Sequence, residues 1–432
     1  MPIQTIRRGG VALLTVLTLA ACDLDLTDPN NPGEDVVEGS ISGMLQVAVG
    51  LQAEYSNEIV DPIFVSALVA DEVGAGGGTF QYIQELDVGG SEFDNTNGSS
   101  EAPWAGQYDV VQIANVLIQS APGVGMGEAT LSGVLALAKT FKAMAFGNLL
   151  MTFEQIPTDV DPTEPSPDFD SRDAGIEEVF RLLDEARGHL ASTAPSAEFT
   201  EEVLAPGLDL GQLIDAMTAR YALAFGRTGQ AMTAAQRVDL GSFSEFRFDA
   251  NDPNPVWNLM AAGGNSTEMR PEDTFRLGAE EGDGRVAFWA TEEDIEGANV
   301  PLDAHARYGS NGAAILAVLP DEMRLIMAEA QAASGDLATA RALINEVREP
   351  CSSAFDEPVA CLPPLTAEDL PDAQSVRDQI LYERRYELFG LGLGWDDLRR
   401  LAPAEVKYMF MPVPNSECDR NVNTPPGLCT IG

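Results

Sequence analysis

The residue types that carry most enzymatic chemistry are scarce in this sequence. Its 432 residues include only two histidines, His189 and His305. Metal sites built on several histidines, and Ser-His-Asp or Cys-His catalytic groups, therefore lack the side chains that they need. Carboxylates are abundant, and two of them could act as acid and base in a surface glycoside hydrolase. No spacing motif singles out such a pair, although the composition alone does not exclude one. We expect a protein that is not an enzyme, with no catalytic residue, cofactor or metal site.

Four of the five cysteines have the pattern of a disulfide framework. Cys22 follows an N-terminal apolar segment, whereas the other four are Cys351, Cys361, Cys418 and Cys429. Four thiols in an exported chain predict two disulfides, and three pairings are possible. The local pairing, 351 with 361 and 418 with 429, is favoured because each bond then closes a short loop that contains proline. A zinc site is disfavoured because the sequence has no CxxC pair.

The chain is strongly acidic. Lys and Arg number 25 against 68 Asp and Glu, which gives a net charge of −43. Not one Lys or Arg occurs from Asp23 to Ala138, and the first after that is Lys139. Such a surface repels phosphate backbones and anionic lipid, so we expect no nucleic-acid partner and no basic membrane-docking patch.

The N-terminus has the organisation of a bacterial lipoprotein signal. Arg7 and Arg8 precede an apolar run over residues 11–20. Ten residues span only about 15 Å as a helix, too short for a hydrocarbon core of about 30 Å. The sequence Leu-Ala-Ala-Cys that ends at Cys22 resembles a lipobox. We therefore expect residues 1–21 to be a cleaved signal peptide, Cys22 to be lipidated, and residues 22–39 to form a flexible acidic tether.

Helical periodicity dominates the rest of the chain. Asp173 and Asp209 are expected to be N-caps. Gly335 separates two helical segments that would form a tetratricopeptide-like hairpin, the second beginning at Asp336, although no strict 34-residue repeat is present. The other predicted helices cover residues 40–55, 105–120, 128–151, 174–191, 372–390 and 395–401.

Long stretches rich in Gly, Pro, Asn and Asp separate these helices. Loops of such length are uncommon in compact proteins and are usually functional or poorly ordered. The sequence therefore predicts a mainly α-helical scaffold that displays a binding face on its loops. The stretches are residues 72–104, 156–172, 240–320 and 350–371.

Several segments together resemble the SusD/RagB family, over nearly all of the mature chain. The most specific segment is ILYERRYELFGLGLGWDDLRRL, residues 380–401. The C-terminal FMPVPNSECDRN is similar to the Pro-Ile-Pro ending of the family. The other segments are CDLDLTDPNNP, AKTFKAMAFGNLLMTFEQIPTDV and AEAQAASGDLATARALINEVRE.

The resemblance implies one SusD-like domain over residues 40–432, with an N-terminal part to about 350 and a C-terminal motif region from about 351. It implies a lipid-anchored, surface-exposed protein of the outer membrane that acts as the lid of a SusC-like TonB-dependent transporter. Members capture nutrients without covalent chemistry, usually oligosaccharides and sometimes peptides. A peptide-binding member would, with this acidity, prefer cationic peptides.

The resemblance also suggests where a ligand binds. Sugar recognition needs flat aromatic faces together with carboxylates or amides. In the family the first ligand loop follows a helix that ends in an acidic pair, which here is Asp71 and Glu72. Phe80 and Tyr82 are the aromatic residues of that loop, and Asn97 is a nearby amide. Four glycines between residues 74 and 78 would let a ligand approach the backbone.

The long 240–320 stretch corresponds to a second part of the ligand face in the family. Its tryptophans, Trp257 and Trp289, are candidate stacking platforms. Family members often carry more aromatic residues in these loops than this chain does. A flexible loop without a ligand remains the alternative for the glycine-rich segment.

Overall fold

The computed structural model describes residues 39–430 except 90–92, 162, 164–165 and 262–268. The expected signal peptide, Cys22 and most of the tether lie outside the described residues. The elements of the first half are α2 (Ile41–Glu58), α3 (Val60–Val69), α4 (Gln81–Val88), α5 (Gly98–Ser120), α6 (Glu128–Thr152), α7 (Arg172–Ser192), α8 (Leu210–Ala224) and α9 (Thr228–Ala235). Those of the second half are α10 (Asp273–Leu277), α11 (Arg285–Trp289), α12 (Pro320–Ser334), α13 (Leu337–Arg348), α14 (Ala373–Glu387), α15 (Gly394–Leu401) and α16 (Asn415–Arg420).

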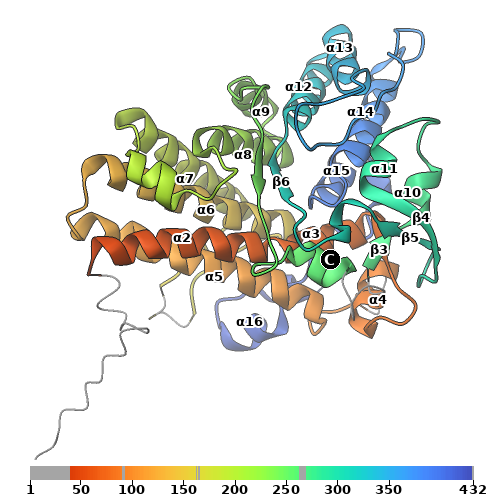
Figure 1. The fold of residues 1–432 in the computed structure, drawn as a ribbon. Coiled ribbons are helices and arrows are strands. Elements are labelled where there is room, and N and C mark those ends of the chain that lie inside the picture. The colour runs from red at the N-terminus through yellow and green to blue at the C-terminus, as the bar shows by residue number, and fades with distance from the viewer. Residues whose placement is uncertain (1–38, 90–92, 162, 164–165, 262–268, 431–432) are drawn as a thin grey trace, which may run out of the picture.

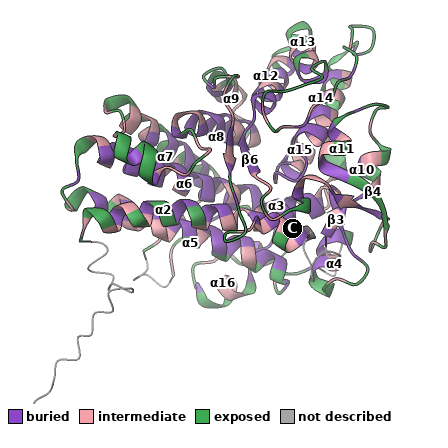
Figure 2. Cartoon of the chain, viewed as in Figure 1, coloured by how far each residue is buried: buried purple, intermediate pink, exposed green. Residues whose placement is uncertain are grey.

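Helix α6 is the centre of the helical half of the molecule, where it lies beside α2, α5 and α7 (Figure 1). It is long and apolar enough to cross a membrane by length and composition alone. However, 78% of its most apolar window is buried within the described structure. A helix that is apolar on all sides and enclosed by neighbours is a core helix. Figure 2 accordingly shows α6 mostly buried, whereas α7 exposes its outer face.

The structure confirms the predicted N-caps of two helices and corrects that of a third. Asp209 and Asp336 cap α8 and α13, and Gly335 ends α12 with a left-handed φ of 88°. The N-cap of α7 is Ser171, whose hydroxyl accepts the Ala174 N–H at 3.3 Å, so the assignment of Asp173 was wrong. Asp173 instead lies in the first turn, where its carboxylate favours the positive end of the helix dipole.

The predicted hairpin of α12 and α13 is confirmed, and α14 packs against both of its helices. Small residues such as Ala328, Ala332 and Ala340 allow the helices to approach closely and form a second, smaller core with Ile344 and Ile380. The fold class is therefore the one predicted, mainly α-helical with tetratricopeptide-like helix pairs.

The expectation of irregular structure over 72–104 and 240–320 was wrong in part. These stretches contain α4, the first turns of α5, the short helices α10 and α11, and all six strands of three two-stranded antiparallel sheets. The sheets pair β1 (Val73–Ala75) with β3 (Met269–Pro271), β2 (Ser244–Phe246) with β6 (Ile315–Val318), and β4 (Ala290–Ile295) with β5 (Leu302–His305). Strands of three to six residues are too short to show a clear alternating pattern in the sequence.

Both local disulfides are present. Cys351 pairs with Cys361 and Cys418 pairs with Cys429, with Cα–Cα distances of 4.3 and 6.2 Å. The first bond closes an irregular loop beside α13, and the second ties α16 to the C-terminal segment. The family-like motif of α14 and α15 is held by buried ion pairs, such as that of Arg384, whose Nε lies 2.8 Å from Asp397 Oδ1.

Candidate functional site

Phe80 and Tyr82 form an exposed aromatic platform at the start of α4. Their side chains are 58% and 39% exposed, and they are the only exposed aromatic residues in the part of the chain that the structure describes. The ring centroids lie 5.6 Å apart, and the ring planes differ by only 13°. Two nearly parallel rings that meet solvent offer a flat apolar surface to the CH face of a sugar.

The turn beneath this platform is fixed by two buried polar side chains. Asn97 donates one amide N–H to the Tyr82 carbonyl at 2.9 Å and another to Glu85 at 3.2 Å. Its side-chain oxygen accepts the Ser99 N–H, which makes Asn97 the N-cap of α5. At the other end of α4, Asp87 accepts the Ala75 N–H of β1 at 2.9 Å. Asn97 is 6% exposed, so it positions the platform and does not offer its amide to a ligand.

The glycines beside the platform have different surroundings. A Cβ on Gly74 would lie 2.7 Å from a methyl group of Leu302, so glycine is required there by packing. Gly77 donates its N–H to the Glu296 carbonyl at 2.8 Å, which joins the loop to the segment after β4. A Cβ on Gly78 would meet no atom within 4 Å, so the backbone at Gly78 is open to approach.

The two carboxylates of the predicted acidic pair, Asp71 and Glu72, face different surroundings. Asp71 has a positive φ of 52°, and its carboxylate lies 2.5 Å from Lys407 Nζ. Glu72 is only 2% exposed and accepts the Gly390 N–H at 3.2 Å. Burial raises the pKa of Glu72 to about 8. The Asp71 side chain therefore remains partly accessible beside Lys407, whereas Glu72 faces the motif region inside the protein.

Asp71 also belongs to a cluster of three carboxylates whose oxygen atoms lie within 4.8 Å of one another. The other two members are Asp87 and Glu272, whose pKa values are raised by burial to about 6 and about 7. Lys407 lies against Asp71 and Asp87, and Asn299 donates to Asp87 and Glu272 at 3.2 and 3.3 Å. These partners supply the positive charge and hydrogen bonds, so the cluster joins α4, β3 and the C-terminal segment.

The two candidate tryptophans lie in unlike places. Trp289 is 0% exposed, and its indole N–H donates to the Tyr386 carbonyl at 2.9 Å. Its ring packs edge-on against Phe288, at a centroid distance of 4.8 Å. Trp257 is half-buried in η3 (Trp257–Ala261), a single turn that contacts β3. Trp257 thus lies near the sheet that carries the glycine-rich loop, whereas Trp289 belongs to the core.

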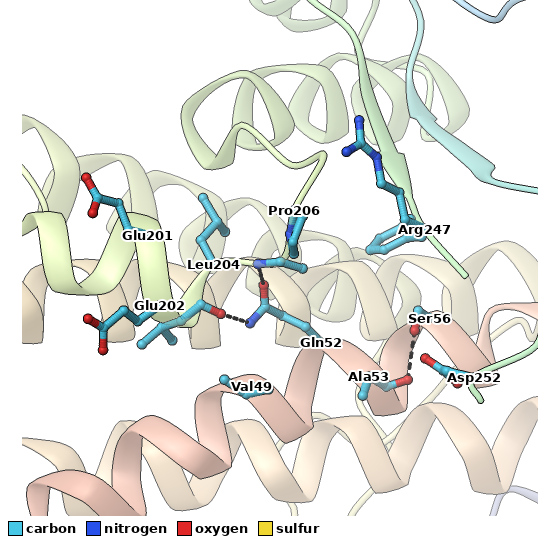
Figure 3. Close-up of a pocket in the computed structure, with 13 residues that line it drawn as sticks. Val49, Gln52, Ala53, Ser56, Glu201, Glu202, Leu204, Pro206, Arg247 and Asp252 are labelled. Carbon is cyan, nitrogen blue, oxygen red and sulfur yellow. Dashed lines mark hydrogen bonds between the residues drawn. The ribbon is translucent and has the colours of Figure 1, made fainter. Parts of the chain in front are cut away.

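A separate cavity of about 360 Å³ opens between α2 and the segment 201–206 (Figure 3). Gln52 fixes this wall, because its side chain donates to the Val203 carbonyl at 2.9 Å and accepts the Ala205 N–H at 2.7 Å. None of the residues predicted from sequence lines it. The cavity joins elements about 150 residues apart, and no local motif in the sequence marks it.

Comparisons with known proteins bear on both the fold and the motif. Residues 322–425 match the model of the SusD family. A SusD superfamily structure from Bacteroides thetaiotaomicron is 15% identical, with a TM-score of 0.69, and the match covers 89% of this chain and 97% of that one. A SusD-like carbohydrate-binding protein from Bacteroides vulgatus is 15% identical, with a TM-score of 0.64 and coverage of 84% and 83%.

A laminarin-binding SusD-like protein is 18% identical, with a TM-score of 0.56 and coverage of 88% and 97%. No curated protein matches the sequence. The structural likeness establishes the common fold, and the sequence match lies in the region of α12 to α16, where the most specific motif is found. The chain therefore shares the SusD-like fold, and its residues 322–425 carry the sequence pattern of the SusD family.

Proposed function

We propose that this protein is a lipid-anchored, surface-exposed protein of the outer membrane that binds a nutrient oligosaccharide and passes it to a SusC-like TonB-dependent transporter. The observation that carries the binding role is the exposed, nearly parallel pair of Phe80 and Tyr82 on a SusD-like fold. Binding of this kind needs shape, stacking and hydrogen bonds and no reactive group.

The proposed site contains fewer of the predicted residues than the sequence suggested. Phe80 and Tyr82 would stack on sugar rings, Asp71 would accept hydroxyl hydrogen bonds, and Gly78 would allow close approach of the backbone. Trp257 remains a candidate stacking residue, in the turn that contacts β3. The buried positions of Trp289, Glu72 and Asn97 leave them no surface for a ligand, so the proposal assigns them to the support of the fold.

The lipid anchor and the transporter partner rest on the sequence. The lipobox-like segment at Cys22 and the acidic tether support attachment to a membrane, and the family supports a TonB-dependent partner. Extraction of the tagged lipoprotein from outer membranes in mild detergent tests both. A TonB-dependent barrel recovered in equal amount supports the lid role, whereas recovery from the inner membrane, or without a barrel, contradicts it.

Binding is tested by calorimetry against laminari-, malto-, manno- and xylo-oligosaccharides. The double variant Phe80→Ala/Tyr82→Ala should bind at least tenfold more weakly than the parent, because both stacking faces are removed. Phe355→Ala is the matched control, since Phe355 stacks on Phe243 at 5.1 Å in a different, half-buried pair. Equal affinity of the parent and the double variant would exclude the platform, and release of reducing sugar during the titration would favour a hydrolase.

A further inference from the structure

We infer that the platform discriminates against anionic glycans, and that Glu296 is a determinant of this specificity. The inference rests on the proposed function, because it names the class of oligosaccharide that the same site accepts: neutral or amine-bearing chains, with uronic and sulfated chains rejected. It follows from the charges that surround Phe80 and Tyr82.

Carboxylates approach the platform from more than one element. Glu85 lies on α4 itself, and Asp94 lies on the loop whose Asn97 holds the Tyr82 carbonyl. Glu296 lies on the opposite side, where its Cγ would be 3.2 Å from a Cβ on Gly77. Glu296 is exposed, and no ion pair or side-chain hydrogen bond joins it to another described residue. Its charge is therefore available to a ligand that crosses the glycine-rich loop.

The strand that precedes Glu296 adds to the same field. In β4, Glu292, Glu293 and Asp294 are all exposed. Exposed charges also protect an edge strand from unwanted pairing. Even if the charges serve to protect the strand, they create a negative electrostatic potential that disfavours an approaching anion.

Basic side chains on the neighbouring elements are already engaged. Lys407 is paired with Asp71, and Arg276 is paired with Asp303 at 2.8 Å. Arg285 is 0% exposed, inside the core. None of these three can neutralise the carboxylate or sulfate of a ligand without giving up an existing partner.

Three further arginines lie nearby in the fold. Arg270 on β3 experiences the charge of Glu293 and has a partner within the protein. Arg385 donates to the backbone carbonyl of Asp71 at 3.4 Å, on the side of the motif region. The third is Arg420, the last residue of α16. The first residue of that helix, Asn415, donates its N–H to the Asn95 carbonyl in the loop before α5. Arg420 lies at the opposite end of the helix, beside Asn421, whose amide donates to the Pro167 carbonyl.

The N-terminus of α5 is the remaining source of positive potential, because a helix N-terminus attracts anions. Two of its first N–H groups are taken by Asn97, which accepts from Ser99 through its side chain and from Ser100 through its backbone. Glu101 adds a negative charge to the first turn. The described surroundings of the platform thus provide exposed carboxylates, whereas Arg385, which forms no ion pair with another described residue, is directed to the motif region and its Nε is buried.

A matched series of glycans tests this inference. The probes are laminarihexaose, its C6-oxidised glucuronan form and its 6-amino-6-deoxy form, with calorimetry at 20 and 500 mM salt. At low salt we expect the oxidised form to bind at least tenfold more weakly than laminarihexaose and the amino form to bind at least as tightly. The differences should shrink at high salt, because exposed charges are screened within about 3–10 Å at high to moderate ionic strength. If another neutral oligosaccharide of the panel binds instead, its own oxidised and amino derivatives replace these probes.

The variants separate a local effect from the overall charge of the protein. Glu296→Lys should recover at least threefold of the affinity for the oxidised form. Glu368→Lys makes the same change of charge at an exposed position in the 350–371 loop and should recover none. Equal binding of neutral and oxidised forms, or equal recovery in both variants, overturns the inference while leaving the platform intact. Failure of every neutral probe overturns the proposed function and this inference together.

Discussion

The Phe80–Tyr82 platform and the Trp289 cluster use aromatic side chains in opposite ways. Both lie in the half of the molecule that contains the small sheets (Figure 1). Phe80 is 58% exposed, whereas Trp289 is 0% exposed, with its indole N–H satisfied inside the core. The platform rings stack on each other and remain partly exposed to solvent. The Trp289 ring itself holds the core together, whereas the turn under Tyr82 is held by hydrogen bonds from Asn97. An aromatic ring is therefore a candidate binding surface where other groups stabilise the fold around it.

The largest effect expected from this comparison concerns stability. Trp289→Ala should lower the free energy of unfolding by about 3–5 kcal/mol, because it removes a fully buried ring and leaves a cavity. Phe80→Ala should change it by less than about 0.5 kcal/mol. Urea denaturation followed by circular dichroism measures both. A comparable loss in the two variants would mean that the platform is part of the core.

Glu72, which is buried and bonded to Gly390 next to Phe389, makes the stability of the core depend on pH. Burial raises the pKa of Glu72 from 4.5 to about 8, so the folded chain holds this proton more tightly than the unfolded chain does. The resulting stabilisation is fully present below about pH 4.5 and is lost as the pH rises toward 8. The raised pKa values of Asp87 and Glu272 act in the same direction.

Glu72→Gln tests this link. Between pH 5.5 and 8 the wild-type protein should lose about 2–3 kcal/mol more than the variant, since the amide mimics the protonated acid and does not titrate. Denaturation curves at several pH values provide the measurement, with the exposed Glu368→Gln as control. Parallel pH profiles for wild type and Glu72→Gln would show that Glu72 is not the titrating group.

The sequence predicted the scaffold better than the site, for physical reasons. Helices such as α6 carry apolar residues over many turns, and Gly335 and Asp336 mark the break between α12 and α13. The local cysteine pairing was predictable because each bond closes a short loop. The short strands were not predictable, because a segment of three residues such as Val73–Ala75 is too short to show the alternation of buried and exposed residues that marks a strand.

Residue type alone could not separate the candidates in the site. Trp289 and Phe80 were both candidate stacking residues, and their different burial in the structure distinguishes them. Asn97 was expected to face a ligand, but its position directly before α5 is also that of a helix cap, which is a signal that the sequence does contain. The role of Lys407 depends on contacts across more than 300 residues and has no local signature.

A smaller effect should follow from loosening the turn under the platform. Asn97→Ala removes the cap of α5 and two hydrogen bonds to α4, and should cost about 1 kcal/mol of stability. Oligosaccharide affinity should also fall about threefold, because Tyr82 loses its support. Asp209→Ala removes an equivalent cap from α8 and serves as the control. Equal affinity losses in the two variants would indicate a general effect of stability.

The smallest expected change distinguishes the glycines of the platform loop. Gly78 does not have a positive φ, and an added methyl group there meets no atom, so Gly78→Ala should leave stability unchanged or raise it by up to about 1 kcal/mol. If a sugar approaches the backbone, the same methyl group should weaken its binding about threefold. Gly74→Ala, which crowds Leu302, should instead lower stability by about 1–3 kcal/mol. Unchanged affinity in Gly78→Ala would place the ligand on the outer ring faces, away from the loop backbone.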